Sequence, residues 1–124
     1  MRIAMWGLAF KAGTDDIREA PSLRLIEDLL EEGASICAHD PAATDHTRAL
    51  LGSRIDYAET NYGALADADA LVVVTDWNEY RQPDFDRVKQ GLKQPVIVDG
   101  RNLYDINRMR EIGLRYYSIG RPSL

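Results

Sequence analysis

Two cationic side chains of this 124-residue chain follow strand-like runs and could hold an anionic ligand. Lys11 comes after the run Arg2–Trp6, and Arg101 comes after the run Pro95–Val98. A lysine ammonium supplies a point charge and an arginine guanidinium a two-pronged fork, which together suit a phosphate or diphosphate. Solvated loop cations look the same in a sequence, so spacing alone leaves both interpretations open.

The other reactive side chains favour structural roles. Cys37 lies between Ile36 and Ala38 in an apolar run, which predicts a buried thiol, because a nucleophilic cysteine needs an accessible, electropositive site. His39 and His46 have no cysteine or histidine at ligand spacing, so no metal site is predicted. No Ser–His–Asp arrangement or nucleophile elbow is found, and we assign no catalytic residue to this chain.

The glycines after the first run do not form a common phosphate-binding motif. Gly7 is followed by Leu8, and the next glycine is Gly13, whereas the dinucleotide fingerprint is G-x-G-x-x-G and a P-loop needs Gly-Lys-Ser/Thr. Asp40 resembles the acid that binds a ribose, but it lies 33 positions beyond Gly7, where about 20 is usual. We therefore disfavour a complete dinucleotide site. Arg18 either joins an ion-pair network that shapes a turn or faces a ligand.

Strand-like and helix-like runs alternate along the chain, which predicts βαβ units. The expected strands are Arg2–Trp6, Ser35–His39, Ile55–Ala58, Ala70–Thr75, Pro95–Val98 and Leu114–Ile119. The expected helices are Pro21–Glu32, Ala43–Leu51, Tyr62–Ala68, Phe85–Leu92 and Asp105–Ile112. The fold class is α/β: a three-layer, doubly wound, Rossmann-like domain with a mainly parallel sheet of about six strands, in the order 3-2-1-4-5-6.

This topology directs attention to one edge of the sheet. Ligands of such folds bind outside the carboxyl ends of the strands, near the point where the strand order reverses, here between strands one and four. Three loops reach that edge: Gly7–Glu19, Thr75–Arg81 and Asp99–Tyr104. Lys11 and Arg101 lie on two of them, so both could reach one crevice.

Composition and charge limit the classes of ligand and partner that this chain can bind. The length suits one domain, and the net charge of −5 argues against non-specific nucleic-acid binding. Residues 1–100 sum to −8 and residues 101–124 to +3, so a small anion could still be held locally. The longest apolar stretch, Ala70–Val74, is far shorter than a membrane span. The single cysteine suits a reducing compartment, so we expect a cytoplasmic protein.

Short motifs occur in a fixed order along nearly the whole chain. They are GLAFKAGTDDIREAPS at residues 7–22, Gly33-Ala34, Asp40-Pro41, VTDWNEY at 74–80, VDGRN at 98–102 and YSIGR at 117–121. This set resembles the carboxyl-terminal, UDP-binding domain of the UDP-glucose/GDP-mannose dehydrogenase family. The DGRNLY and YSIGR segments are most similar to the bacterial UDP-glucose 6-dehydrogenase branch. The GDP-mannose and UDP-N-acetylmannosamine branches share the first motif and stay open.

The resemblance implies a function for the whole enzyme and a part of it for this chain. Members use two NAD⁺ to oxidise the sugar C6 alcohol to a carboxylate, here UDP-glucose to UDP-glucuronate. An amino-terminal Rossmann domain binds NAD, and a central helical region carries the catalytic cysteine and supports a homodimer. By position, Phe10, Lys11 and Arg101 would bind the nucleotide sugar, and Arg18 would reach the NAD held by the other domain.

The departures from the family pattern matter equally. The segment with the family's catalytic cysteine and the G-x-G-x-x-G domain are absent from these residues, and Cys37 does not match that cysteine. We expect residues 1–124 to be a single nucleotide-sugar-binding domain excised from a longer dehydrogenase of polysaccharide biosynthesis, and inactive alone. The alternative is a non-catalytic nucleotide-binding module of the same fold.

Overall fold

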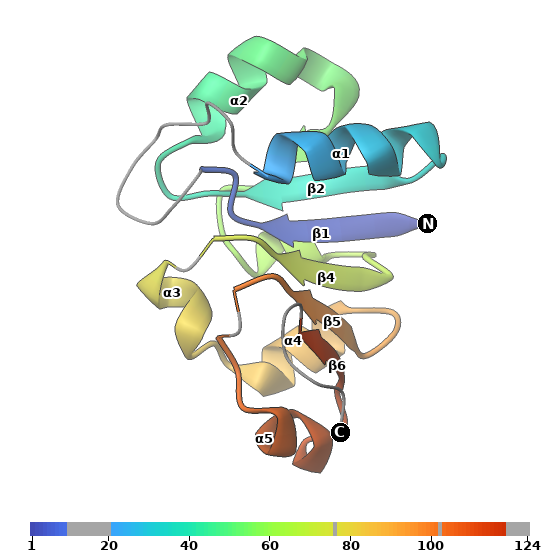
Figure 1. Ribbon diagram of the computed structural model, residues 1–124, viewed down its shortest axis with the longest axis vertical. Coiled ribbons are helices and arrows are strands. Elements are labelled where there is room, and N and C mark those ends of the chain that lie inside the picture. Colours follow the sequence, from blue (N-terminus) through green and yellow to red (C-terminus); the bar gives the residue numbers. More distant parts are fainter. Residues whose placement is uncertain (10–20, 76, 102, 119–124) are drawn as a thin grey trace.

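In the computed structural model, the described residues form a six-stranded sheet in the order β3-β2-β1-β4-β5-β6 (Figure 1). The structure describes residues 1–9, 21–75, 77–101 and 103–118. All neighbouring strand pairs are parallel. The order 3-2-1-4-5-6 predicted from the sequence is confirmed, and with it the reversal point between β1 and β4.

Strands and helices alternate along the described residues. The strands are β1 (Arg2–Trp6), β2 (Ser35–His39), β3 (Asp56–Tyr57), β4 (Ala70–Val73), β5 (Val96–Asp99) and β6 (Arg115–Ser118). The helices are α1 (Pro21–Glu31), α2 (Thr44–Leu51), α3 (Asn78–Arg81), α4 (Phe85–Gly91) and α5 (Ile106–Glu111). The described residues also contain two 3₁₀ turns, η1 (Gly52–Arg54) and η2 (Gly63–Leu65).

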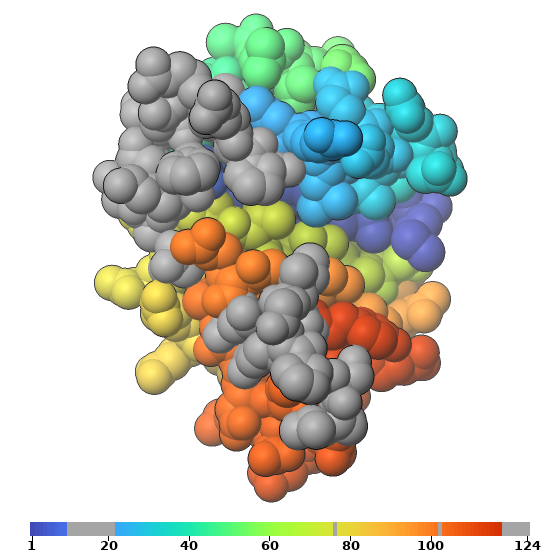
Figure 2. Space-filling model, in the orientation of Figure 1, coloured from blue at the N-terminus to red at the C-terminus, as the bar shows by residue number. Residues whose placement is uncertain are grey.

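The sheet separates two hydrophobic cores, because successive side chains of a strand point to opposite faces. Ile3 and Met5 of β1 join the core with α1 and α2, whereas Ala4 and Trp6 join the core with α3, α4 and α5. Figure 1 shows α1 and α2 beside β1 and β2, and α3 to α5 beside β4 to β6. In Figure 2 the surface of α2 (green) therefore lies at one end of the molecule and that of α5 (orange-red) at the other.

Local signals explain where several helices begin and end. Asp84 and Asp105 precede α4 and α5, and their carboxylates accept backbone N–H groups of the first turns, as N-caps do. Gly33 follows α1 with a φ of +88°, a left-handed conformation that favours glycine. None of the helices in residues 1–9, 21–75, 77–101 and 103–118 has the length and apolar character needed to cross a bilayer.

Some predicted boundaries are wrong in detail. The helix expected over Tyr62–Ala68 is only the turn η2, which has too few residues for a stable α-helical segment. Helix α3 was not predicted, because four residues after a strand carry no measurable periodicity. The strand expected over Ala70–Thr75 ends at Val73, and Thr75 instead takes part in loop packing.

Candidate functional site

The carboxyl ends of β1 and β4 lie side by side and lead into the loops expected to bind ligand. Gly7 has a φ of +101°, and its N–H donates to the carbonyl of His39 (2.8 Å) at the end of β2. A Cβ built on Gly7 would overlap the side chain of Thr75. The Thr75 hydroxyl donates to the carbonyl of Ala9 (2.9 Å), so this residue secures the start of the β1 loop from the β4 side.

Asp40, directly after β2, is buried and binds backbone on two segments. Its Oδ2 accepts the N–H groups of Leu8 (2.8 Å) and Ala9 (3.1 Å). Its Oδ1 accepts the N–H groups of Ala42 and Ala43 (2.8 Å each). Because both oxygens are occupied by backbone donors, Asp40 holds the two loops together, which agrees with disfavouring it as a ribose-binding acid.

Asp99, the last residue of β5, is fully buried and organises the loop of Arg101. Its Oδ1 accepts the N–H of Arg101 (2.8 Å), and its Oδ2 accepts the N–H groups of Leu103 (2.6 Å) and Tyr104 (3.3 Å). The hydroxyl of Tyr116 in β6 donates to the same Oδ2 (2.6 Å). The backbone of Arg101 is thereby fixed at the carboxyl edge while its side chain is exposed.

A buried histidine–tyrosine pair lies between these two loops. The Tyr80 hydroxyl donates to the His39 carbonyl (2.9 Å), so the contact between its oxygen and His39 Nδ1 (2.7 Å) needs a proton on Nδ1. The other ring nitrogen, Nε2, lies 4.0 Å from Oε2 of Glu79. Burial lowers the pKa of His39 and raises the pKa of Glu79, so both groups are biased toward their neutral forms.

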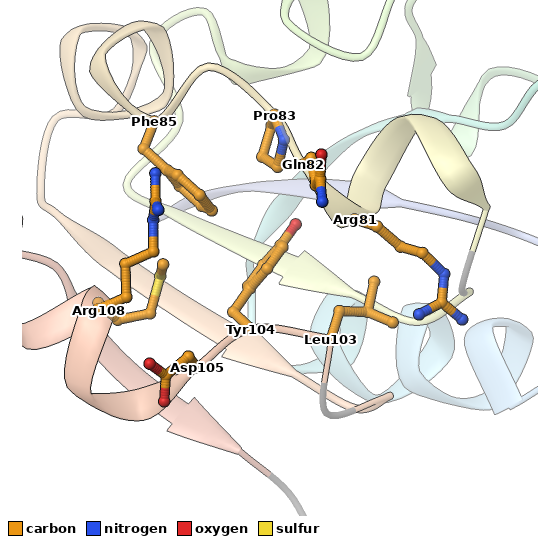
Figure 3. A pocket seen from close by; sticks show the side chains of 9 residues that line it. Arg81, Gln82, Pro83, Phe85, Leu103, Tyr104, Asp105 and Arg108 are labelled. Atoms are coloured by element: carbon orange, nitrogen blue, oxygen red, sulfur yellow. The ribbon is translucent and has the colours of Figure 1, made fainter.

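A pocket of about 480 Å³ opens beside the Asp99 loop, between α3, α4 and α5 (Figure 3). Its described lining includes Arg81, Phe85, Tyr104 and Arg108. The guanidinium of Arg108 lies 5.7 Å from the centre of the Phe85 ring, a cation–π distance. Arg101 does not line this pocket, so the pocket is separate from the contact predicted on that loop.

Only one of the four predicted binding residues lies in the described part of the chain. Arg101 is placed at the carboxyl edge, where the topology predicts ligand binding. Phe10, Lys11 and Arg18 lie outside the described residues. The backbone just before them, Gly7–Ala9, is held by the contacts given above, so the chain enters that segment from a defined position.

The structural interpretation of Cys37 is confirmed, and both tryptophans contact the core. Cys37 is buried, and burial raises the pKa of its thiol, which keeps it protonated and unreactive. Trp6 is fully buried, and Trp77 packs against the same core from its rim. The roles of Tyr80, Tyr104 and Asp99 were not predicted from the sequence. For Asp99 a signal existed, since an acid that ends a strand before glycine often binds the following loop through its carboxylate.

Residues 4–106 match the UDP binding domain of the UDP-glucose/GDP-mannose dehydrogenase family. The chain belongs to this family. It is 49% identical to a UDP-glucose 6-dehydrogenase of Pseudomonas aeruginosa, an alignment that covers 97% of the chain and 28% of that protein. It is 44% identical to the UDP-glucose 6-dehydrogenase TuaD of Bacillus subtilis, over 98% of the chain and 26% of that protein. The chain thus spans little more than a quarter of the length of these relatives.

Solved structures of family members share the fold. A UDP-glucose dehydrogenase from Pyrobaculum islandicum superposes with a TM-score of 0.75 at 33% identity, over 94% of this chain and 24% of that one. An NDP-N-acetyl-D-galactosaminuronic acid dehydrogenase from Methanosarcina mazei superposes with a TM-score of 0.84 at 31% identity. This alignment covers 97% of this chain and 24% of that one. The Rossmann-like domain predicted from the sequence is therefore confirmed both by the sheet and by its relatives.

Proposed function

We propose that this chain is the nucleotide-sugar-binding domain of an NAD-dependent UDP-glucose 6-dehydrogenase. The observation that carries the proposal is the agreement between the family match and the place of Arg101 in the fold. The family's UDP binding domain matches residues 4–106, and the only predicted contact within the described residues, Arg101, sits on a loop fixed by buried Asp99 at the carboxyl edge. That edge is where doubly wound folds bind nucleotides.

The remaining roles come from the family resemblance. Phe10 and Lys11 would bind the nucleotide sugar together with Arg101, with Lys11 near the diphosphate. Arg18 would reach NAD, which the amino-terminal domain of the whole enzyme would hold. The whole enzyme would be a cytoplasmic homodimer and would convert UDP-glucose to UDP-glucuronate in polysaccharide biosynthesis. This chain would contribute substrate binding and no catalytic group.

Calorimetric titration of the 124-residue chain with UDP tests the binding role. Removing a charge-assisted hydrogen bond costs ~1.5–3 kcal/mol, so Lys11→Ala and Arg101→Ala should each weaken binding about 10- to 150-fold. Lys93→Ala and Arg115→Ala are matched controls, because both residues are exposed and lie at the amino ends of β5 and β6, at the opposite edge. Equal effects of all four substitutions would contradict the assignment.

A chimera tests the dehydrogenase role. The corresponding part of the Pseudomonas aeruginosa relative would be replaced by this chain, and NADH formation from UDP-glucose would be followed. The proposal expects an active chimera whose KM for UDP-glucose rises on Arg101→Ala, while the isolated chain forms no NADH. NADH formation by the isolated chain would show that the catalytic group lies within it, against the assignment made here.

A second candidate keeps the site and changes the sugar. It is favoured by the superposition on the Methanosarcina mazei enzyme, whose name specifies an N-acetylated sugar. The same chimera separates the candidates if it is supplied with UDP-glucose, UDP-N-acetylmannosamine and GDP-mannose in parallel. Preference for UDP-glucose would support the first proposal, and preference for an N-acetylated or GDP-linked sugar would support the other branches.

A further inference from the structure

A series of hydrogen bonds, linked through the residues Tyr80 and Tyr104 themselves, joins the two loops of the candidate site. It starts at the carbonyl of His39, which accepts both the N–H of Gly7 (2.8 Å) and the hydroxyl of Tyr80 (2.9 Å). The carbonyl of Tyr80 in turn accepts the hydroxyl of Tyr104 (2.5 Å). The N–H of Tyr104 donates to Asp99 (3.3 Å), whose other oxygen holds the Arg101 loop.

Every side chain on this path is shielded from water. The exposed fractions are 0% for Tyr80, 4% for Tyr104, 5% for His39 and 0% for Asp99. Burial raises the pKa of both tyrosines above the usual value, so their hydroxyls stay protonated and keep donating. Hydrogen bonds in such a low-dielectric interior are strong when satisfied and costly when broken, so the path is geometrically stiff.

Apolar packing alone does not need these hydroxyls. The Tyr80 ring stacks on Trp6 with ring centres 5.1 Å apart, and the Tyr104 ring meets Phe85 edge-on at 5.3 Å. Phenylalanine would preserve both ring contacts. Figure 3 shows the Tyr104 side chain between Phe85 and Leu103, directed toward the segment that carries Arg81 and Gln82. The hydroxyls therefore contribute hydrogen bonds between the loops and are not needed for the packing of the core.

We propose that Tyr80 and Tyr104 are positioning residues of the nucleotide-sugar site. Their hydroxyls set the spacing between the backbone of Gly7–Ala9, after β1, and the loop that carries Arg101. A nucleotide that contacts both loops needs that spacing fixed before it binds. The inference rests on the proposed function, because it assumes that the two loops bind one ligand.

The test uses hydroxyl deletions in the ¹⁵N-labelled 124-residue chain, which has its own two-sided core. The variants are Tyr80→Phe, Tyr104→Phe and the double variant. Tyr57→Phe is the matched control, because its hydroxyl donates to the Gly52 carbonyl (3.0 Å) outside the path. Thermal melting of each variant confirms that it is folded. Tyr104→Phe is the safer of the two if one is unstable, because the Tyr80 hydroxyl contacts both the carbonyl and Nδ1 of His39.

Amide exchange measures the link without ligand. Tyr104→Phe should speed exchange of the Gly7 amide, at the other end of the path, and of the neighbouring Leu8 amide, which donates to Asp40, about threefold or more. Tyr57→Phe should leave these amides unchanged. A purely local role for Tyr104 predicts changes only at its own contacts, so unchanged Gly7 and Leu8 exchange would overturn the link.

UDP titration measures what the link does for binding. Each single variant should weaken UDP binding about three- to tenfold, and the double variant should be no weaker than the worse single variant, because both break one path. Multiplying effects would show two independent contacts and overturn the proposal. Absence of UDP binding by the unsubstituted chain would reject the proposed function and the positioning role with it. UDP binding unaffected by the tyrosine variants would reject the positioning role alone.

Discussion

Asp40 and Asp99 occupy equivalent places at the two sides of the reversal point, yet their carboxylates are used differently. Each directly follows or ends a strand and is buried. The two oxygens of Asp40 bind two segments that are far apart in sequence, with two backbone donors each. Asp99 instead binds its own loop, with one donor on Oδ1 and the other three, including the Tyr116 hydroxyl, on Oδ2.

This difference separates a residue that supports the fold from one that supports the predicted ligand contact, Arg101. Loss of an Asp40 oxygen breaks two hydrogen bonds whichever oxygen is replaced. Asp99 has an asymmetric arrangement, in which only the N–H of Arg101 depends on Oδ1. The Asp40 side is therefore expected to respond to substitution through stability, and the Asp99 side through binding.

The largest effect is expected from Gly7→Ala, which disrupts the Asp40 side without changing a carboxylate. The new Cβ would overlap the side chain of Thr75 and lie 2.8 Å from its backbone nitrogen, at a φ of +101°. We expect a loss of more than about 3 kcal/mol, or failure to fold, measured by urea denaturation.

Gly33→Ala is the matched control for that experiment. Gly33 also has a positive φ, +88°, but nothing lies within 4 Å of its added Cβ. Its cost should be only the left-handed backbone penalty of about 1–2 kcal/mol. If the two alanine variants have equal stability, the contact with Thr75 does not constrain the β1 loop.

Replacing each carboxylate by its amide tests the comparison directly. Asp40→Asn should cost about 2–4 kcal/mol, because two backbone donors face an NH₂ group in either orientation. Asp99→Asn should cost about 1–2 kcal/mol, because the amide can keep its oxygen in the Oδ2 place and lose only the N–H of Arg101. Asp99→Asn should nevertheless weaken UDP binding. Equal losses of stability in urea denaturation would contradict the distinction between the two residues.

The pH dependence of stability probes the Asp40 side more gently. Burial lowers the pKa of His39 in the folded chain. At pH values between this lowered pKa and the ordinary pKa, the unfolded chain therefore binds a proton that the folded chain does not. The contribution of neutral His39 to the free energy of unfolding is complete above the ordinary histidine pKa of ~6.5. It falls as the pH drops toward the pKa of the folded state, by up to about 1.4 kcal/mol per pH unit. His39→Asn, which keeps a donor near the Nδ1 position, should flatten this slope in denaturation curves.

Glu79 is the group that could mask this effect. Burial raises its pKa, so it binds protons in the folded state above its ordinary value and gives a slope of the opposite sign. Repeating the measurement in Glu79→Gln removes that contribution. A slope that survives in the His39→Asn, Glu79→Gln double variant would arise from other groups, against the assignment to His39.

The smallest effect is expected from Tyr116→Phe on the Asp99 side. It removes one hydroxyl from Oδ2, which keeps two backbone donors, so the loss should be about 0.5–1.5 kcal/mol. The exposed bond of Tyr57 should contribute less in the same urea measurement. A larger loss than that of Asp40→Asn would reverse the order of the two sides.

Much of the fold follows from patterns that the chain carries locally. Apolar runs of four to six residues separated by helical periodicity specify parallel strands covered on both faces, and the order of such strands has few solutions. The helix predicted over Tyr62–Ala68 proved to be only the turn η2, and helix α3 was not predicted, for one reason. Segments this short gain too little from propensity, and only contacts such as Tyr80 against Trp6 stabilise them.

The candidate site divides in the same way. The family resemblance of the ordered motifs predicts Arg101, Lys11 and Phe10 as ligand contacts. The sequence does not show that the Tyr80 carbonyl meets the Tyr104 hydroxyl, because the two residues come from loops on different strands.

By itself, the sequence determined the α/β class and the strand order, since both depend on residue type and spacing, and its ordered motifs indicated the family and, through it, the predicted binding residues. Only the tertiary structure decided which buried carboxylate joins two loops, which one fixes Arg101, and that tyrosine hydroxyls connect them. The physical reason is that a buried polar group must find its partners in space, and those partners are set by how the strands bring distant loops together.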